Sequence, residues 1–142
     1  MSFLRSMDIS GSALTAQRLR MDVIAENIAN AQTTRTANGE PYRRKYVLMS
    51  ESEGTFSQHL DGAMAAGNGV KVTRIAEDES PLTPVYNPSH PDADENGYVN
   101  MPNVNTVTEM IDMMSATRSY EANVTAINAF KNMAFKSLEI GK

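Results

Sequence analysis

The sequence predicts a mainly α-helical protein, in which long N- and C-terminal helices form a coiled-coil domain and carry a small β-rich insert between them. Apolar residues recur at helical spacing near both ends, and nearly all prolines and glycines lie between these two stretches. The chain has 142 residues, enough for one domain of ordinary size. We divide it into an N-terminal helical segment, 1–34, an insert, 35–104, and a C-terminal helical segment, 105–142.

The first long helix is predicted over residues 3–31. One apolar column repeats every seven positions and comprises Met7, Leu14, Met21 and Ile28. Ile24 belongs to a partly filled companion column, and two such columns make a coiled-coil seam. Gly11 is a weak point that costs about 1 kcal/mol relative to alanine. The turn signal Asn38-Gly39 then ends the helical pattern.

The second long helix is predicted to begin at "TVTE", which fits a capping box with Thr106 as the cap and Glu109 three residues on. An apolar seam follows, with members that alternate at three and four residues. These members are Met110, Met113, Thr117, Tyr120, Val124, Ile127, Lys131, Ala134 and Leu138. A helix of this length spans about 50 Å, which is long for a small globular domain.

The insert has short-strand character in three places. "YVLM" (46–49) and "GVKVTRIA" (69–76) are rich in β-branched and apolar residues. "LTPVYNP" predicts a short edge strand, because its prolines would interrupt a central one. Asn96-Gly97 predicts a turn with positive φ before an extended "YVNM".

The two helices do not provide enough apolar cover for each other. The C-terminal helix contains ten Ser, Thr or Asn residues, which weaken it in isolation by about 5 kcal/mol relative to alanine. Pairing the helices buries one stripe of each and leaves others uncovered, namely Ile111, Met114, Phe130, Met133 and Phe135. We expect neighbouring chains to cover them, and the alternative is an intramolecular hairpin with scattered exposed methionines.

Asparagines flank the predicted seam and suggest a role in helix register. Asn27, Asn30, Asn123 and Asn128 could form hydrogen bonds across a helix interface, since a buried asparagine exchanges stability for specificity. The alternative for each is a local hydrogen bond or exposure to solvent.

Several classes of function are disfavoured. The chain has no cysteine, a net charge of −4 and no nucleophile or phosphate-loop motif. We therefore predict no enzyme, cofactor or metal.

"DADENG" (92–97) matches half of a calcium loop, but Asn103 stands where a bidentate glutamate is needed, so a turn is preferred. His59 and His90 are isolated in loops. No apolar leader or membrane-spanning stretch is visible.

Arg43 and Arg44 lie in a basic cluster, although the net charge of the chain is negative. A nucleic-acid patch is one interpretation, although the net charge opposes it. We favour contact with acidic loops 77–79 or 92–95 of a neighbouring subunit, so charge reversal should impair assembly and spare folding. The predicted assembly interface comprises Met7, Leu14, Met21, Ile24, Asn27, Ile28, Asn30, Arg43, Arg44, Met110, Met113, Tyr120, Asn123, Val124, Ile127 and Leu138.

Two long motifs resemble those of a known family. "SGSALTAQRLRMDVIAENIANAQTTRT" is similar to the N-terminal motif of the bacterial flagellar axial proteins, which form the rod, hook and hook-associated structures. "NGYVNMPNVNTVTEMIDMMSATRSYEANV" and the residues that follow resemble the C-terminal motif of the rod branch. The chain departs from the family pattern at Glu26, where the family usually has asparagine.

The resemblance implies a structural subunit of the proximal rod that assembles through its terminal helices and transmits torque. It implies contacts with other copies of the chain, with the rod proteins FlgB, FlgF and FlgG, with the adaptor FliE and the MS ring, and with the flagellar export apparatus. It also implies a periplasmic location reached without a cleaved signal peptide. A soluble cytoplasmic adaptor that binds partner helices is the alternative.

Overall fold

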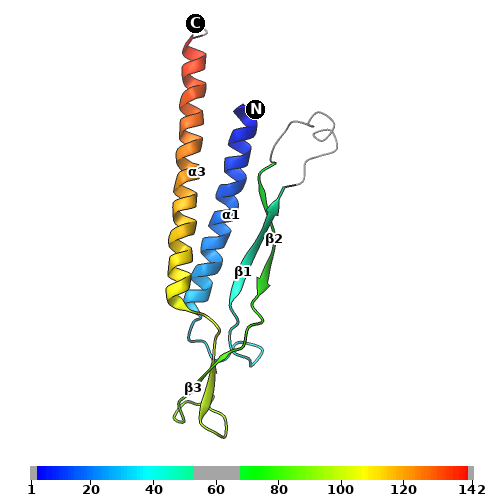
Figure 1. Ribbon diagram of the computed structural model, residues 1–142, viewed down its shortest axis with the longest axis vertical. Helices are drawn as coiled ribbons and strands as arrows, with labels where there is room; N and C mark the ends of the chain where they lie inside the picture. The colour runs from blue at the N-terminus through cyan, green and yellow to red at the C-terminus, as the bar shows by residue number, and fades with distance from the viewer. Residues whose placement is uncertain (1–2, 53–67, 141–142) are drawn as a thin grey trace.

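Two long helices pack side by side and are joined by a β-rich insert (Figure 1). The computed structural model describes residues 3–52 and 68–140. Helix α1 spans Phe3–Ala29 and helix α3 spans Thr106–Ile140. The predicted fold class, two terminal helices with a small β insert, is confirmed. The first helix ends two residues earlier than predicted, and the second matches the predicted segment closely.

The core between the helices is thin and built from aliphatic residues. Ala16, Val23, Ile24 and Ala116 are buried. The hydroxyl of Thr117 on α3 donates to the sulfur of Met21 on α1, with 3.5 Å between Oγ1 and Sδ. The helices run in opposite directions, so the beginning of α3 lies beside the end of α1 (Figure 1).

The most deeply buried face of α1 differs from the predicted heptad column. Met7, Leu14, Met21 and Ile28 are only half-buried, whereas Val23, Ile24 and Asn27 are buried. The reason is that α1 has two neighbours. Helix α3 covers one side of α1 and the first hairpin covers the other. The most deeply buried residues of α1 are therefore those that lie between these two contact surfaces.

Asn105, not Thr106, caps helix α3. Its Oδ1 accepts hydrogen bonds from the backbone N–H groups of Val107, at 3.0 Å, and Thr108, at 3.2 Å. Thr106 is the first helical residue. The predicted capping box is therefore wrong, because asparagine one residue earlier is an equally good cap. Glu109 is consequently free to turn toward α1.

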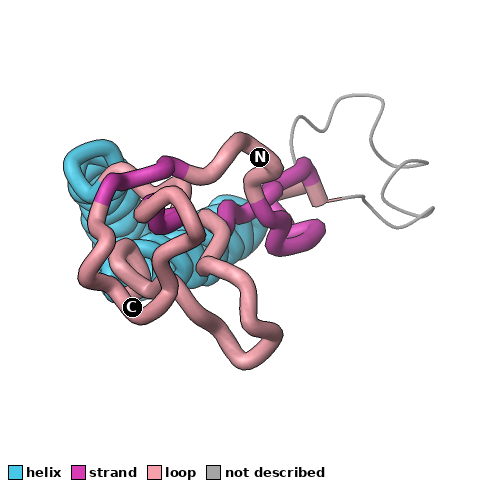
Figure 2. Tube along the Cα trace, turned by 90° about the horizontal axis from the view of Figure 1, so that it is seen from below, coloured by secondary structure: helices cyan, strands magenta, loops and turns pink. Residues whose placement is uncertain are grey.

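The insert consists of two antiparallel hairpins. Strands β1 (Lys45–Glu51) and β2 (Val70–Glu77) pair with a register irregularity between Leu48 and Met49. Strands β3 (Thr83–Tyr86) and β4 (Tyr98–Met101) form the second hairpin. All of the predicted strands are confirmed. The first hairpin runs along α1, and the second lies below the helix ends, where Figure 2 shows it from beneath.

Gly69 anchors the first hairpin to α1 through a close approach. Its φ is +87°, and a Cβ at this position would lie 2.5 Å from Oγ of Ser12. That hydroxyl also accepts a hydrogen bond from the backbone N–H of Val70 at 3.0 Å, so it is held in place. Within residues 3–52 and 68–140, neither helix is both long and apolar enough to cross a lipid bilayer.

Two glycine substitutions should have opposite effects on stability. Gly69→Ala should lower the free energy of unfolding by about 1–3 kcal/mol, because of its positive φ and the clash with Ser12. Gly11→Ala should raise it by about 0.5–1 kcal/mol, since Gly11 is helical and a Cβ there meets nothing within 4 Å. Urea unfolding of both variants measures the two changes in the free energy of unfolding. Changes of the same sign would contradict the prediction.

Candidate assembly interface

Helix α3 presents a large apolar surface to solvent. Val107, Met110, Ile111 and Met114 follow one another at helical spacing on the side that faces away from α1, and each is more than half exposed. Met133, Phe135 and Leu138 form a second exposed set on the last turns. Exposed apolar surface of this extent is typical of a protein–protein contact. The prediction that Ile111, Met114, Met133 and Phe135 lack cover within the chain is confirmed, while Phe130 is half-buried.

The α3 seam continues beyond the helix that covers it. Met113, Tyr120, Val124 and Ile127 face α1 and are half-buried. Leu138 belongs to the same seam, but α3 extends past the beginning of α1 (Figure 1), and Leu138 is 70% exposed. The last turns of α3 therefore offer an unpartnered strip of the seam.

Asn27, which was predicted to form a hydrogen bond across a helix interface, does bond Glu109 of α3 and lies at the centre of a buried polar cluster. It is 0% exposed. Its Nδ2 donates to the backbone carbonyl of Lys45, at 2.7 Å, and to Oε2 of Glu109, at 2.9 Å. Its Oδ1 accepts from the hydroxyl of Tyr42 and from the backbone N–H of Lys45, both at 2.9 Å. The amide thus uses both donors and both acceptor positions within its own chain.

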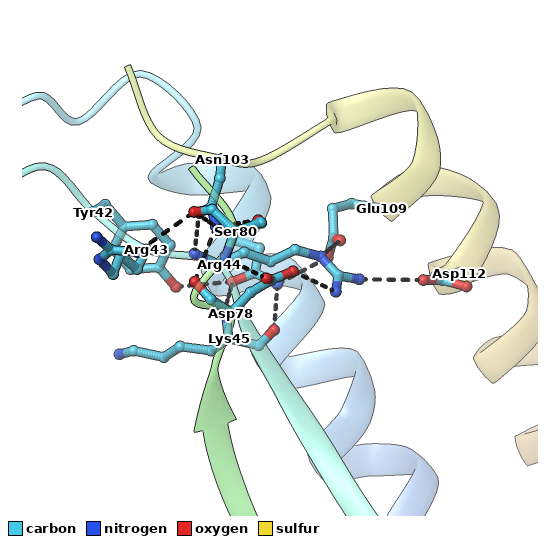
Figure 3. Close-up of polar contacts among 10 residues, drawn as sticks. Tyr42, Arg43, Arg44, Lys45, Asp78, Ser80, Asn103, Glu109 and Asp112 are labelled. Carbon is cyan, nitrogen blue, oxygen red and sulfur yellow. Dashed lines mark hydrogen bonds and ion pairs between the residues drawn. The ribbon is translucent and has the colours of Figure 1, made fainter. Parts of the chain in front are cut away.

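Glu109 joins this cluster to Arg44, as Figure 3 shows. The carboxylate is 0% exposed, and its Oε1 lies 2.7 Å from Nε of Arg44. The same guanidinium also lies 3.8 Å from Asp78 and 3.6 Å from Asp112. The single cation of Arg44, just before β1, therefore faces carboxylates of α3 and of the segment after β2.

Asn103 ties the segment after β2 to the same cluster (Figure 3). Its Oδ1 accepts from the backbone N–H of Arg44 at 2.8 Å, and its Nδ2 donates to the carbonyl of Asp78 at 3.0 Å. The backbone N–H of Ser80 donates to the Asp78 carboxylate, and this bond lowers the pKa of Asp78, with further contributions from the Ser80 hydroxyl and Arg44. Asp78 is thus kept ionised opposite Arg44.

The other asparagines make local contacts. Nδ2 of Asn30 donates to the carbonyl of Glu26 at 2.9 Å, and Nδ2 of Asn123 donates to the carbonyl of Ser119 at 2.8 Å. Asn128 is exposed. Glu26, where the sequence departs from the family pattern, pairs with the ammonium of Lys45 at 2.7 Å. The departure therefore supplies an ion pair between α1 and β1.

The basic cluster meets acidic loops of its own chain. Arg44 contacts Asp78 in the loop 77–79, and Arg35 lies 3.6 Å from Asp92. The sequence predicted that Arg43 and Arg44 contact these acidic loops in a neighbouring subunit, and for Arg44 the structure corrects that prediction. Arg43 differs, because within the described residues its guanidinium donates one 3.5 Å hydrogen bond, to the carbonyl of Ser80, and acts on Asp78 through its charge alone. Arg43 thus stays a candidate for contact with another subunit.

Burial raises the pKa of Tyr42 to about 12, and the charges of Glu26, Glu109 and Glu77 add to the effect. The unfolded chain loses this proton near pH 10, whereas the folded protein keeps it to about pH 12. The free energy of unfolding should therefore fall by about 2–3 kcal/mol as pH rises through that interval.

A pair of tyrosine variants tests whether Tyr42 causes this fall in the free energy of unfolding at alkaline pH. In Tyr42→Phe the free energy of unfolding should no longer fall with rising pH. In Tyr46→Phe, which alters a partly exposed ring, the fall should remain. Urea unfolding at several alkaline pH values tests the pair, and an unchanged slope in Tyr42→Phe would contradict the assignment.

The "DADENG" segment forms the expected turn. Oδ1 of Asp94 accepts from the backbone N–H groups of Asn96, at 2.9 Å, and Tyr98, at 2.8 Å, and Gly97 has a φ of +81°. His90 accepts from the backbone N–H of Asp92 through Nδ1, and His59 lies outside the described residues. Across the described ranges, no three acidic or histidine side chains are grouped to hold a metal ion.

Comparison with known proteins agrees with the architecture of two terminal helices. Residues 7–35 match the family "Flagella basal body rod protein", and residues 95–140 match the family "Flagellar basal body rod FlgEFG protein C-terminal". These two ranges contain most of α1 and all of α3.

Three relatives that align over nearly their whole length have the same name. The chain is 53% identical over 150 aligned positions to the flagellar basal-body rod protein FlgC of Bacillus subtilis, with all of both chains covered. It is 46% identical to the FlgC protein of Borreliella burgdorferi, with 99% of this chain and 98% of that protein covered. It is 44% identical to FlgC of Salmonella typhimurium, again with both chains fully covered. The chain therefore belongs to the flagellar basal-body rod protein FlgC family, whose members are structural subunits of the rod and not enzymes.

Proposed function

We propose that this chain is a subunit of the proximal rod, that it assembles through its terminal helices, and that it transmits torque. The observation that carries the proposal is the uncovered end of the α3 seam, where Leu138 is 70% exposed. A helix from a neighbouring subunit would complete that seam by the same packing that α1 supplies lower down. Long helices nested in this way would give the stiffness that a drive shaft needs.

The proposed interface uses the residues that the fold leaves accessible. Met110 and Leu138 are exposed, and Met7, Leu14, Met113 and others of the predicted set are half-buried. Ile24, Asn27 and Arg44 are engaged inside the chain and would act indirectly, by holding the helices in position. Arg43 would contribute a charged contact at the side of the insert.

The partners follow from the family resemblance. They would be other copies of the chain, the rod proteins FlgB, FlgF and FlgG, and the adaptor FliE with the MS ring. The subunit would reach the periplasm through the flagellar export apparatus. In support, the exposed surface of α3 is apolar and helical, and it suits partners that also present amphipathic helices.

Charged substitutions on the exposed apolar surface should block assembly without unfolding the subunit. Leu138→Lys and Ile111→Lys each remove a large apolar contact that is worth about 1.5–3 kcal/mol when buried. Incorporation into purified basal bodies should therefore fall about 10-fold to 100-fold, with a matching loss of motility in a strain that carries only the variant. Thermal unfolding of the purified monomer should be unchanged, since both side chains are already exposed.

Ser137→Lys is the matched control for Leu138→Lys. Ser137 is the neighbouring exposed residue, and its hydroxyl only bonds the carbonyl of Ala134 in its own helix. The Ser137→Lys variant should be incorporated into basal bodies as well as the wild type. Normal incorporation of Leu138→Lys would refute the proposed interface.

A cytoplasmic adaptor that binds partner helices is the second candidate, since it could use the same exposed surface. Cell fractionation separates the two functions. A rod subunit is expected in purified basal bodies at a constant ratio to the other rod proteins, whereas an adaptor would stay in the cytoplasmic fraction.

A further inference from the structure

We propose that the exposed methionines of α3, Met110, Met114 and Met133, are sites of reversible oxidation by hydroperoxides, and that formation of the sulfoxide at Met110 and Met114 prevents a partner from docking there. The pattern of oxidation follows from the fold of the single chain. The effect on docking rests on the proposed function.

Methionine supplies all of the sulfur in this protein, and the fold exposes only part of it. The chain has 10 methionines and no cysteine, so its thioethers are the sulfur groups that an oxidant meets. Met110, Met114 and Met133 are 54%, 56% and 54% exposed. The other methionines that the structure describes are half-buried, namely Met7, Met21, Met49, Met101 and Met113. Within residues 3–52 and 68–140, α3 therefore carries all of the exposed methionines.

Met113 and Met114 differ in accessibility although they are adjacent in sequence. Successive residues of a helix point about 100° apart, so Met113 faces α1 while Met114 faces solvent. Met21 lies on the opposite side of the same helix contact, where its sulfur is 3.5 Å from Oγ1 of Thr117. The packing of the two helices therefore shields Met21 and Met113 from dissolved oxidants and leaves Met114 open to them.

The oxidation needs only the exposed thioether and the hydroperoxide. A lone pair of the sulfur attacks one oxygen of the hydroperoxide, the O–O bond breaks and an S–O bond forms. The transferred oxygen gives up its proton, and the leaving oxygen takes up a proton and departs as water or an alcohol. The sulfur thus loses two electrons and the hydroperoxide gains them. Methionine sulfoxide reductases reverse the change, so the modification is not permanent.

Oxidation would make the centre of an apolar surface polar. Met110 and Met114 lie one helical turn apart on α3, beside Val107 and Ile111, and all four residues are exposed. The sulfoxide oxygen accepts hydrogen bonds, and an apolar partner helix has no donor to offer it. Burying a polar group without a hydrogen bond is unfavourable. A partner that docks on the reduced surface should therefore be excluded from the oxidised one.

Limited oxidation of the purified wild-type subunit with hydrogen peroxide tests the pattern. Tandem mass spectrometry of the digested protein resolves the adjacent residues Met113 and Met114. In the folded subunit Met114 should be oxidised about fivefold faster than Met113 and Met21, or more, because the oxidant must reach the sulfur from solvent. In concentrated urea the three should react at equal rates, since the fold no longer shields any of them. Equal rates in the folded subunit would overturn the proposal.

Two double variants test the effect on docking. Met110→Gln with Met114→Gln places a polar amide where the sulfoxide would be, whereas Met110→Leu with Met114→Leu keeps the surface apolar at similar volume. Glutamine and leucine are both good helix formers, so both variants should fold. The leucine variant should be incorporated into basal bodies about tenfold better than the glutamine variant, or more.

Equal incorporation of the two variants would overturn the effect on docking. A failure of the proposed function would look different, because the wild-type chain would itself be missing from purified basal bodies. That result would refute the effect on docking together with the proposed function, and the rates of oxidation in the purified subunit would still decide whether Met114 is an oxidation site.

Discussion

Arg44→Glu should unfold the protein or leave it barely folded at neutral pH. The substitution removes the only cation that contacts the buried carboxylate of Glu109 among the described residues, and it places a second carboxylate beside it. Removing one partner of a buried ion pair costs about 3–5 kcal/mol, and the added repulsion with Asp78 and Asp112 increases this. Proteins of this size have a total stability of about 5–15 kcal/mol. Urea unfolding followed by circular dichroism would measure the loss.

Arg43→Glu is the matched control for this prediction. The two arginines are adjacent in sequence, but within the described residues Arg43 makes one long hydrogen bond, to the carbonyl of Ser80, and acts on Asp78 through its charge alone. Its reversal should change the free energy of unfolding by less than about 1 kcal/mol. The sequence alone predicted that reversal at either position would spare folding, and the structure keeps that expectation for Arg43 only. Equal stability of the two variants would show that Arg44 is not essential to the cluster.

Asn27→Asp should be the second most damaging single substitution at neutral pH. The new carboxylate has no N–H to donate, so the carbonyl of Lys45 and Oε2 of Glu109 both lose a donor and face a negative oxygen about 3 Å away. Buried groups left without a partner cost about 1–3 kcal/mol each, and more when charged. We expect a loss of about 3 kcal/mol or more in the free energy of unfolding.

This loss should become smaller in acid. Two carboxylates in contact favour sharing one proton in the folded state, whereas in the unfolded chain both ionise near pH 4. The folded variant thus binds more protons than its unfolded state, and its stability relative to wild type rises as pH falls toward about 5. Asn30→Asp is the control, because among the described residues the Asn30 side chain bonds only the carbonyl of Glu26 and the hydroxyl of Thr33, both close by in the sequence. A difference from wild type that does not change with pH would contradict this mechanism.

The sequence by itself determined the elements of this protein. The heptad columns predicted both long helices, the β-branched runs predicted the strands, and Asn96-Gly97 predicted the tight turn before β4. It also showed that much of α3 has no apolar cover within the chain, and Ile111 and Met114 are indeed exposed. Each of these features depends on residues close together along the chain, where spacing and intrinsic conformational preference act directly.

Only the tertiary structure decided the partners of the buried polar groups. Glu109 fits a local capping box in sequence, yet its bonds go to Asn27, 82 residues away, and to Arg44, 65 residues away. Asn27 was likewise predicted to flank the seam and to bond across a helix interface, but the sequence did not indicate that it also joins α1 to β1. The physical reason is that a polar side chain bonds whichever group the packing of three elements brings within about 3 Å, and no local spacing encodes that meeting.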